Sequence, residues 1–161
     1  MKRKKVLLLN PPGKGVYLRD YYCSKSAKGN AIYHPVDLLY LSGILSREHD
    51  VEAIDCIASG IGAAECRRRI AALRPDAVIF LTGHLSWDED ISFIESLPNR
   101  DECLFIGSGD ILLDTRGEKF LERDALDAAL LDFTTDDVLS YLRGDYENVA
   151  YMHYRTPGGR V

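Results

Sequence analysis

The sequence lacks the clustered cysteines that zinc and iron–sulfur sites require. Its four cysteines are Cys23, Cys56, Cys66 and Cys103, and no two of them form a CxxC or CxxxCxxC motif. Because these metal centres need thiolates at close spacing, the sequence supports no metal site within this chain. We expect unpaired thiols in a reducing compartment, with Cys56, Cys66 and Cys103 in the core.

Long apolar runs and an excess of basic residues are also absent. The basic start at residues 2–5 leads into a short apolar segment that Pro11 and Pro12 interrupt, so neither a signal peptide nor a membrane span is predicted. A formal net charge of −5 disfavours a nucleic-acid-binding surface, which would be basic. The 161 residues suffice for one domain with a short extension. We therefore expect a cytoplasmic protein that binds neither nucleic acid nor a membrane.

The sequence does contain a regular alternation of short apolar runs and amphipathic segments. The apolar runs predict strands at Val6–Leu9, Val51–Ile54, Ala77–Leu81, Cys103–Ile106 and Ala128–Leu131. Segments with helical spacing follow them at Val36–Arg47, Ile61–Leu73, Ser86–Leu97, Thr115–Arg123 and Thr135–Arg143. Continuous apolar strands between helices indicate a parallel sheet that is buried on both faces. We predict an α/β, Rossmann-like, doubly wound fold with a mainly parallel five-stranded sheet and helices on both faces.

The third predicted helix has a recognisable start. Ser86 and Glu89 have the spacing of a capping box, and Trp87, Ile91 and Ile94 share one apolar face. The acidic run Asp88-Glu89-Asp90 is interpreted as the first turn of this helix, where negative charge complements the helix dipole, rather than as a metal cluster.

The end of the chain departs from the alternation. Val149–Arg155 has strand composition, and the turn signal Thr156-Pro157-Gly158-Gly159 follows it. The returning strand would begin at Arg160, so we read the sequence as a fragment of a longer protein. We predict a Rossmann-like domain over residues 1–145, and a linker or the start of a truncated following domain over residues 146–161. Val149–Arg155 should lie apart from the parallel order, as an edge strand or a linker.

Ligands of open parallel sheets bind beyond the carboxyl ends of the strands. The segments at these ends contain neither a dinucleotide motif nor a phosphate loop. Gly13-Lys14-Gly15 lacks the third glycine of GxGxxG, and no Ser or Thr follows Lys14 as a P-loop requires. We interpret this tripeptide as a flexible loop. Asp55, which ends the second strand, is expected to cap the following turn rather than to bind a ribose.

The connection after the first strand is itself informative. It runs from Asn10 to His34, whereas connections in α/β units usually have about 2–6 residues. Its tyrosines are Tyr17, Tyr21, Tyr22 and Tyr33. This aromatic content is untypical of a disordered linker and predicts a lid or a docking surface.

Small residues follow the third and fourth strands. Gly83 lies after the third, and Gly107-Ser108-Gly109 lies after the fourth. Glycines at these places either let a bulky ligand approach the backbone or merely turn the chain. Their presence at the same edge of the sheet favours a binding crevice.

Several segments, taken in order, resemble a known family. They read NPP, HPVDLLYLSGIL, HDVEAIDC, RPDAVIFLTG and LFIGSG, and they extend from Val6 to about Arg143. This order is similar to that of the N-terminal cobalamin (B12)-binding domain of B12-dependent radical SAM enzymes. The resemblance implies a cobalamin-binding-like domain over residues 1–145, with the cofactor on the carboxyl edge of the sheet.

The resemblance also implies which residues contact the cofactor. Thr82 and Gly83 match the position of the family's Ser-x-Leu motif, and Gly107-Ser108-Gly109 matches its Gly-Gly cradle. The cobalt-ligating DxHxxG motif is absent, and residues 132–136 replace the family's acidic-glycine loop. His84 should line the lower corrin face without obligatory ligation. The implied cofactor-binding residues are Asn10, Pro11, Pro12, Thr82, Gly83, His84, Gly107, Ser108, Gly109, Phe133 and Thr134.

For the full-length parent, the resemblance implies S-adenosylmethionine and a [4Fe-4S] cluster in a C-terminal radical SAM domain of the same chain. Methyl transfer or related radical chemistry would follow, while the fragment alone would not be catalytic. Bulky residues at Gly107 or Gly109 should then block cobalamin without unfolding the domain.

Two alternatives remain open. One is a degenerate module of the same fold that serves domain docking or regulation without a cofactor. The other, a stand-alone flavodoxin-like or nucleotide-dependent enzyme, fits least because no phosphate loop or acid/base pair is present.

Overall fold

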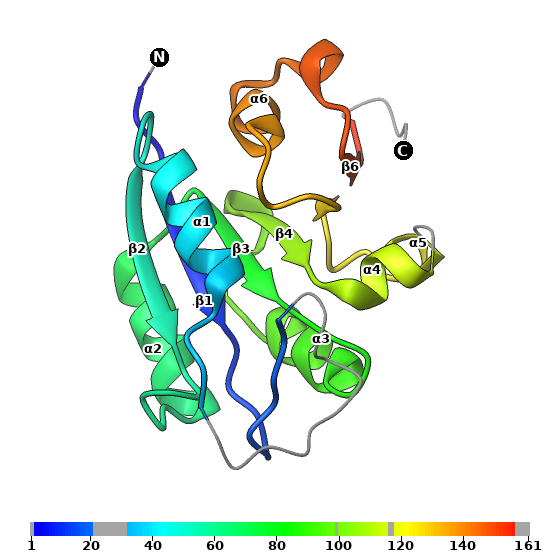
Figure 1. Ribbon diagram of the computed structural model, residues 1–161. Helices are drawn as coiled ribbons and strands as arrows, with labels where there is room; N and C mark the ends of the chain where they lie inside the picture. Colours follow the sequence, from blue (N-terminus) through cyan, green and yellow to red (C-terminus); the bar gives the residue numbers. More distant parts are fainter. Residues whose placement is uncertain (1, 21–31, 99, 116–117, 157–161) are drawn as a thin grey trace.

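The computed structural model describes residues 2–20, 32–98, 100–115 and 118–156. Six strands form one sheet in the order β2-β1-β3-β4-β5-β6 (Figure 1). The strands are β1 (Lys5–Asn10), β2 (Asp50–Asp55), β3 (Ala77–Leu81), β4 (Leu104–Ser108), β5 (Ala128–Leu130) and β6 (Met152–Tyr154). The α-helices are α1 (Val36–Leu45), α2 (Ala63–Leu73), α3 (Trp87–Glu95), α4 (Asp110–Asp114), α5 (Glu118–Glu122) and α6 (Asp137–Arg143).

The first five strands pair in parallel, as predicted, and β6 pairs antiparallel with β5. The predicted five-stranded sheet therefore has a sixth strand at its edge. In this strand Met152 pairs with Leu130 of β5. The segment Val149–Arg155, predicted as an edge strand or a linker, therefore contains an edge strand. The predicted turn at residues 157–159 lies outside the described residues.

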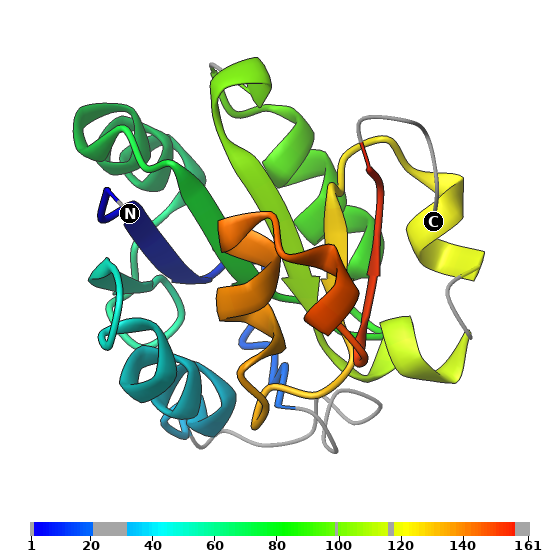
Figure 2. The same cartoon turned by 90° about the horizontal axis from the view of Figure 1, so that it is seen from above.

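Helices cover both faces of the sheet, as Figure 2 shows from above. On one face, Leu7 and Leu9 of β1 join a core with side chains of α2, α3, α4 and α5. On the other face, Val6 and Leu8 join a second core with side chains of α1 and α6. Successive side chains of a strand point to opposite faces, and so a continuous apolar strand requires both layers. The doubly wound Rossmann-like fold predicted from the sequence is confirmed.

Two local predictions differ from the structure. The range predicted as a helix, Thr115–Arg123, contains the short helix α5, and a further short helix that was not predicted, α4, precedes it directly after Gly109. The capping box at Ser86 is also wrong, since no side-chain cap hydrogen bond forms there. The Ser86 hydroxyl instead donates to Asp90 Oδ2 at 2.6 Å.

Gly109 follows β4 in a conformation that glycine alone adopts readily. Its φ is +152°, and a Cβ at this position would lie 1.9 Å from the Thr82 carbonyl oxygen. At Gly107, a Cβ would lie 3.1 Å from Leu112 Cδ1 and 3.2 Å from Leu126 Cδ2. The backbone therefore requires glycine at position 109, and at position 107 a larger side chain would press on two leucines. Bulky replacements are therefore expected to destabilise the fold, which corrects the expectation that they would leave it intact.

Replacing Gly109 with Ala should lower the free energy of unfolding by about 3 kcal/mol, because backbone strain and a backbone clash act together. Gly43→Ala is the matched control, since a Cβ at Gly43 in α1 meets nothing within 4 Å. This control should gain about 0.5–1 kcal/mol from better helix propensity. Urea denaturation measures both, and equal midpoints for the two variants would contradict the prediction.

Candidate functional site

The switch point of the fold lies between β1 and β3. These strands are neighbours, but the connection from β1 carries α1 to one face, and the connection from β3 carries α3 to the other. In open α/β sheets the crevice at this point is the usual ligand site. The predicted residues Asn10 and Pro11 lie at the end of β1, and Thr82 and Gly83 follow β3. Figure 1 shows these strand ends at the bottom of the sheet.

Arg19 occupies this crevice, and sequence reasoning missed it. Its Nη1 donates to Asn10 Oδ1 and to the Pro11 carbonyl oxygen, both at 2.9 Å. Its Nε and Nη2 donate to the two carboxylate oxygens of Asp90, at 3.0 and 2.6 Å. Both side chains of this ion pair are 0% exposed. A lone arginine in a loop gives no sequence signal of burial, and its partner lies 71 positions away.

Asp90 accepts hydrogen bonds from Ser86 as well as from Arg19. The Ser86 hydroxyl donates to its Oδ2, and Arg19 Nε lies 3.2 Å from Ser86 Oγ. Burial raises the pKa of the Asp90 carboxyl, while the Arg19 charge and the hydrogen bonds oppose that rise. The acidic first turn predicted from the sequence thus includes a carboxylate that stabilises a buried cation.

A second carboxylate of α3 fixes the same loop. Glu89 Oε1 accepts a hydrogen bond from the Lys14 backbone N–H at 2.7 Å, and Glu89 Oε2 accepts one from the Tyr17 hydroxyl at 2.9 Å. The hydrogen bond to Glu89 raises the pKa of Tyr17. The Tyr17 ring centroid also lies 5.2 Å from Arg19 Cζ. Residues 13–19 of the predicted lid therefore dock on α3, while Tyr21 and Tyr22 lie outside the described residues.

Two further carboxylates border the crevice on the β2 side. Asp55 Oδ1 accepts from the Ala58 N–H and from Asn10 Nδ2, each at 2.9 Å. It caps the following turn, as predicted. Asp20 lies close enough to Asp55 that burial, followed by the Asp55 charge, raises the pKa of its carboxyl.

Two predicted hydroxyls are buried and unsatisfied. Thr82 and Ser108 are 0% exposed, and within the described part of the chain neither Thr82 Oγ1 nor Ser108 Oγ has a hydrogen-bond partner. Thr82 lies close enough to Asp90 to lower the pKa of that carboxyl, although no hydrogen bond of normal geometry joins them. By strand alternation Thr82 lies on the α3 face, and Ser108 lies on the α1 and α6 face with Ile106. Unpartnered buried hydroxyls are uncommon and indicate a place where a polar ligand atom can bind.

The other predicted residues are spread along the same edge. Phe133, after β5, meets Tyr40 of α1 edge-on with ring centroids 5.9 Å apart. The Thr134 hydroxyl donates to Asp132 Oδ1 at 2.6 Å, which ties it to its own turn. His84 Nε2 lies 3.0 Å from Asp114 Oδ2, so this ring nitrogen already has a partner. Pro12 is buried beside the crevice.

Exposed apolar side chains gather at this edge and on the adjoining part of α1. They come from the first loop, from the start of α1, from the turn after β3 and from the residue before β6. They are Val16, Ile32, Tyr33, Val36, Leu39, Tyr40, Leu85 and Tyr151. No large exposed apolar side chain lies at the opposite edge among the residues that the structure describes. Exposed apolar side chains that are concentrated in this way are typical of a binding surface.

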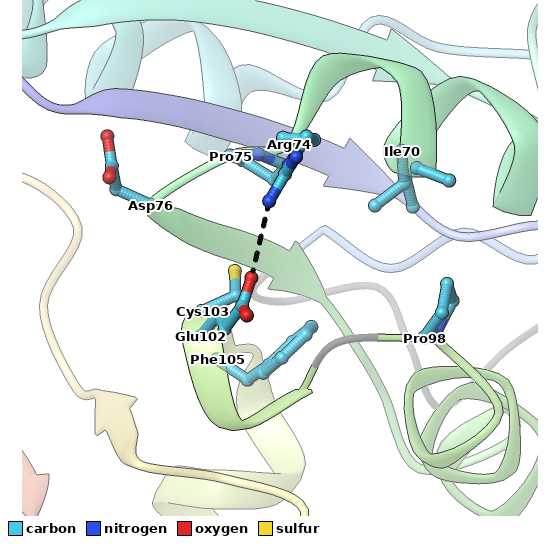
Figure 3. A pocket seen from close by; sticks show the side chains of 9 residues that line it. Ile70, Arg74, Pro75, Asp76, Pro98, Glu102, Cys103 and Phe105 are labelled. Atoms are coloured by element: carbon cyan, nitrogen blue, oxygen red, sulfur yellow. Dashed lines mark ion pairs between the residues drawn. The ribbon is translucent and has the colours of Figure 1, made fainter.

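A pocket also lies at the amino-terminal edge (Figure 3). It encloses about 250 Å³, and Arg74 Nη2 lies 3.5 Å from Glu102 Oε2 at its rim. Burial raises the pKa of its Cys103 thiol to about 12, so the thiol is not a nucleophile at neutral pH. At the switch point only about 10 Å³ is free, because Arg19 fills the crevice.

In the described ranges of the chain, no helix is long and apolar enough to cross a membrane. The same residues contain no cluster of three or more His, Cys, Asp or Glu side chains arranged to hold a metal ion.

Replacing Asp20 with Asn should increase the free energy of unfolding at neutral pH. The folded-state pKa of Asp20 is raised, so its charged form is disfavoured in the fold and its protonated form is favoured. The gain should shrink as the pH falls through the folded-state pKa, because the wild-type carboxyl then becomes neutral as well. Urea denaturation across acidic pH measures this, with exposed Asp101→Asn as the control. A gain that grows on acidification would refute the assignment.

No protein-family model and no curated protein sequence matches the chain. Among solved structures, the fold is similar to part of OxsB, a cobalamin-dependent S-adenosylmethionine radical enzyme determined with aqua-cobalamin and S-adenosylmethionine bound. The identity is 13%, the TM-score is 0.69, and the match covers 99% of this chain and 22% of OxsB. TsrM from Kitasatospora setae, a radical S-adenosylmethionine methyltransferase determined with tryptophan and a SAM analogue, matches with 19% identity and a TM-score of 0.65. That match covers 98% of this chain and 30% of TsrM. The chain thus spans less than a third of either enzyme, and the likeness establishes the α/β fold that they share.

Proposed function

We propose that this chain is a cobalamin-binding module of a radical SAM enzyme. The observation that carries the proposal is the likeness of nearly the whole chain to part of OxsB, which was determined with aqua-cobalamin bound. Cobalamin supplies a cobalt centre that carries methyl groups or takes part in radical chemistry. The module's own task is to hold and orient that cofactor.

The described residues fit such a ligand at the carboxyl edge. Cobalamin presents a broad apolar macrocycle with amide side chains, and this edge combines exposed apolar side chains with buried hydroxyls. Ser108 and Thr82 would donate to or accept from polar atoms of the cofactor, because both hydroxyls lack a partner among the described residues. Tyr40 and Phe133 would border it on the α1 face. The remaining residues assigned to this edge are Asn10, Pro11, Pro12, Gly83, His84, Gly107, Gly109 and Thr134.

The remaining chemistry belongs to a longer parent protein in this proposal. OxsB and TsrM are each more than three times as long as the part that this chain matches. We assign S-adenosylmethionine and the [4Fe-4S] cluster to a C-terminal radical SAM domain, with residues 1–145 as the cobalamin module. We assign residues 146–161 to the link with that domain, of which Met152–Tyr154 pairs with β5 at the sheet edge.

A second candidate function is a docking module that has lost the cofactor. The filled switch point favours it, since Arg19 leaves only about 10 Å³ free there. The apolar edge would then bind another protein domain directly. Cobalamin titration distinguishes the two functions.

The protein should bind hydroxocobalamin weakly, because this proposal assigns part of the cofactor's contacts to a further domain, and the bound cofactor should change its visible absorption spectrum. Ser108→Ala should weaken binding by about 2–12-fold, the value of one lost hydrogen bond. Ser108→Val should weaken it further by filling space on the α1 face. Ser46→Ala, an exposed serine at the far end of α1, is the matched control and should bind as the wild type does. A flat titration of the wild-type protein would replace this proposal with the docking module.

His84→Ala should retain most of the cobalamin affinity, because His84 Nε2 is held by Asp114 at 3.0 Å and is not needed as a cobalt ligand. The spectrum of the bound cofactor should shift little. Absorption spectroscopy and circular dichroism would follow binding and folding together. Complete loss of binding in a folded His84→Ala protein would identify His84 as a ligand instead.

A further inference from the structure

We propose that the pocket at the amino-terminal edge of the sheet binds a free α-amino acid with an apolar side chain. Arg74 holds the carboxylate of this ligand, and Glu102 holds its ammonium group. The pocket lies at the edge opposite to the one assigned to cobalamin, so the inference is independent of the function proposed above. Three features support it, namely the backbone of Arg74, the charges at the mouth of the pocket and its apolar floor.

Arg74 ends α2 in a backbone conformation that suits glycine. Its φ is 49° and its ψ is 63°, and among the described residues it is the one non-glycine residue with a positive φ. Pro75 follows it, and a residue before proline prefers extended conformations. Helix α6 shows the common solution, because Gly144 adopts the left-handed conformation at its end. An arginine at such a position costs stability, and backbone strain of this kind is concentrated at functional sites.

The side chain of this strained residue reaches the mouth of the pocket. Arg74 Nη2 lies 3.5 Å from Glu102 Oε2, and Figure 3 shows the two side chains pointing toward one another. They are 73% and 69% exposed, so the ion pair contributes little and opens at little cost. Its length also exceeds the roughly 2.7–2.9 Å of a charge-assisted hydrogen bond. A ligand carboxylate can therefore bind the guanidinium fork of Arg74, while a ligand ammonium binds Glu102.

The charges of the lining favour a zwitterion over a simple acid. Asp76 is the third charged residue that lines the pocket, which gives two carboxylates and one guanidinium. Arg100 lies nearby but is not part of the lining, and it donates to the Ala125 carbonyl oxygen at 3.0 Å. A ligand with a carboxylate alone would meet this excess of negative charge, whereas an ammonium group beside the carboxylate is attracted by it.

The floor of the pocket is apolar. Ile70 is 5% exposed and Phe105 is 2% exposed, and Pro75 and Pro98 also line the pocket. Its volume of about 250 Å³ is below the range of about 300–1,000 Å³ that is typical of sites for drug-sized ligands. This volume suits the side chain of a single amino acid, whose charged groups then remain at the exposed mouth.

Isothermal titration calorimetry with L-leucine, L-methionine and L-phenylalanine tests the proposal. Phenethylamine and 3-phenylpropionate are the matched probes, because each lacks one of the two charged groups of phenylalanine. Each should bind at least about tenfold more weakly than phenylalanine, the value of one hydrogen bond to a charged group. The amide chemical shifts of Ile70 and Phe105 should change on binding, which locates the ligand in this pocket.

Replacing Arg74 with Gly separates a role in binding from a role in the fold. Arg74→Gly should raise the urea midpoint, because glycine adopts a φ of 49° without strain, and should weaken phenylalanine binding by at least about tenfold. Arg74→Lys keeps the charge but not the bidentate fork, so its affinity should be intermediate. Arg68→Gly is the matched control, since Arg68 is exposed within α2 and does not line the pocket. This control should lower the urea midpoint and leave phenylalanine binding unchanged.

Glu102→Gln tests the contact with the ammonium group. This variant should bind phenylalanine more weakly and should no longer bind 3-phenylpropionate more weakly than phenylalanine, because the carboxylate that distinguishes the two is gone. Asp101→Asn is the control, since Asp101 is also exposed and does not line this pocket. Its affinities for both compounds should equal those of the wild-type protein.

The absence of binding by all three amino acids would overturn the site. Equal affinities of the wild-type protein for phenylalanine and its two analogues would overturn the assignment of the charged groups. A lower urea midpoint in Arg74→Gly, or unchanged phenylalanine affinity in that variant, would show that the arginine serves the end of the helix rather than a ligand.

Discussion

Strands β1 and β3 are buried on both faces, and the rest of the molecule is arranged around that constraint. Each apolar side chain of these strands needs a helix layer, and complete burial of one Leu, Val or Ile contributes about 1.5–3 kcal/mol. The chain meets the requirement with α1 and α6 on one face and α2 to α5 on the other. In β1 the polar side chains are therefore confined to the two ends of the strand, and β3 contains none.

The two edges of the sheet differ in the side chains that they carry. The carboxyl edge concentrates exposed apolar side chains, unsatisfied hydroxyls and a buried ion pair. The amino edge holds a pocket of about 250 Å³, but the thiol of this pocket is unreactive and its ion pair is exposed. At the carboxyl edge, the crevice that the topology favours is filled by Arg19, a side chain of the protein itself.

A buried arginine is costly unless its partners are complete. Desolvating two charges costs several kcal/mol per ion, and it is recovered only when geometry and additional hydrogen bonds are good. Arg19 and Asp90 meet that condition through Ser86, Asn10 and Pro11. Through these contacts the pair joins the first loop to β1 and α3. Gly107 and Gly109 also serve internal packing, because the absence of a side chain at each makes room for leucine side chains and for the backbone of the protein.

The apolar runs and the helical spacing determined the fold class, the five parallel strands and most of the helix positions. These are local patterns, and burial on one or both faces dictates them residue by residue. The edge of the sheet at which a ligand is expected followed from the parallel direction of the strands.

Only the tertiary structure decided how that edge is filled. The Arg19–Asp90 pair joins residues 71 positions apart, and no periodicity marks either as buried. Ser86 was predicted to cap its own helix, but its hydroxyl donates a hydrogen bond to the Asp90 carboxylate instead. Sequence patterns report burial and local turns, whereas the partners of polar groups depend on which distant segments the fold brings together.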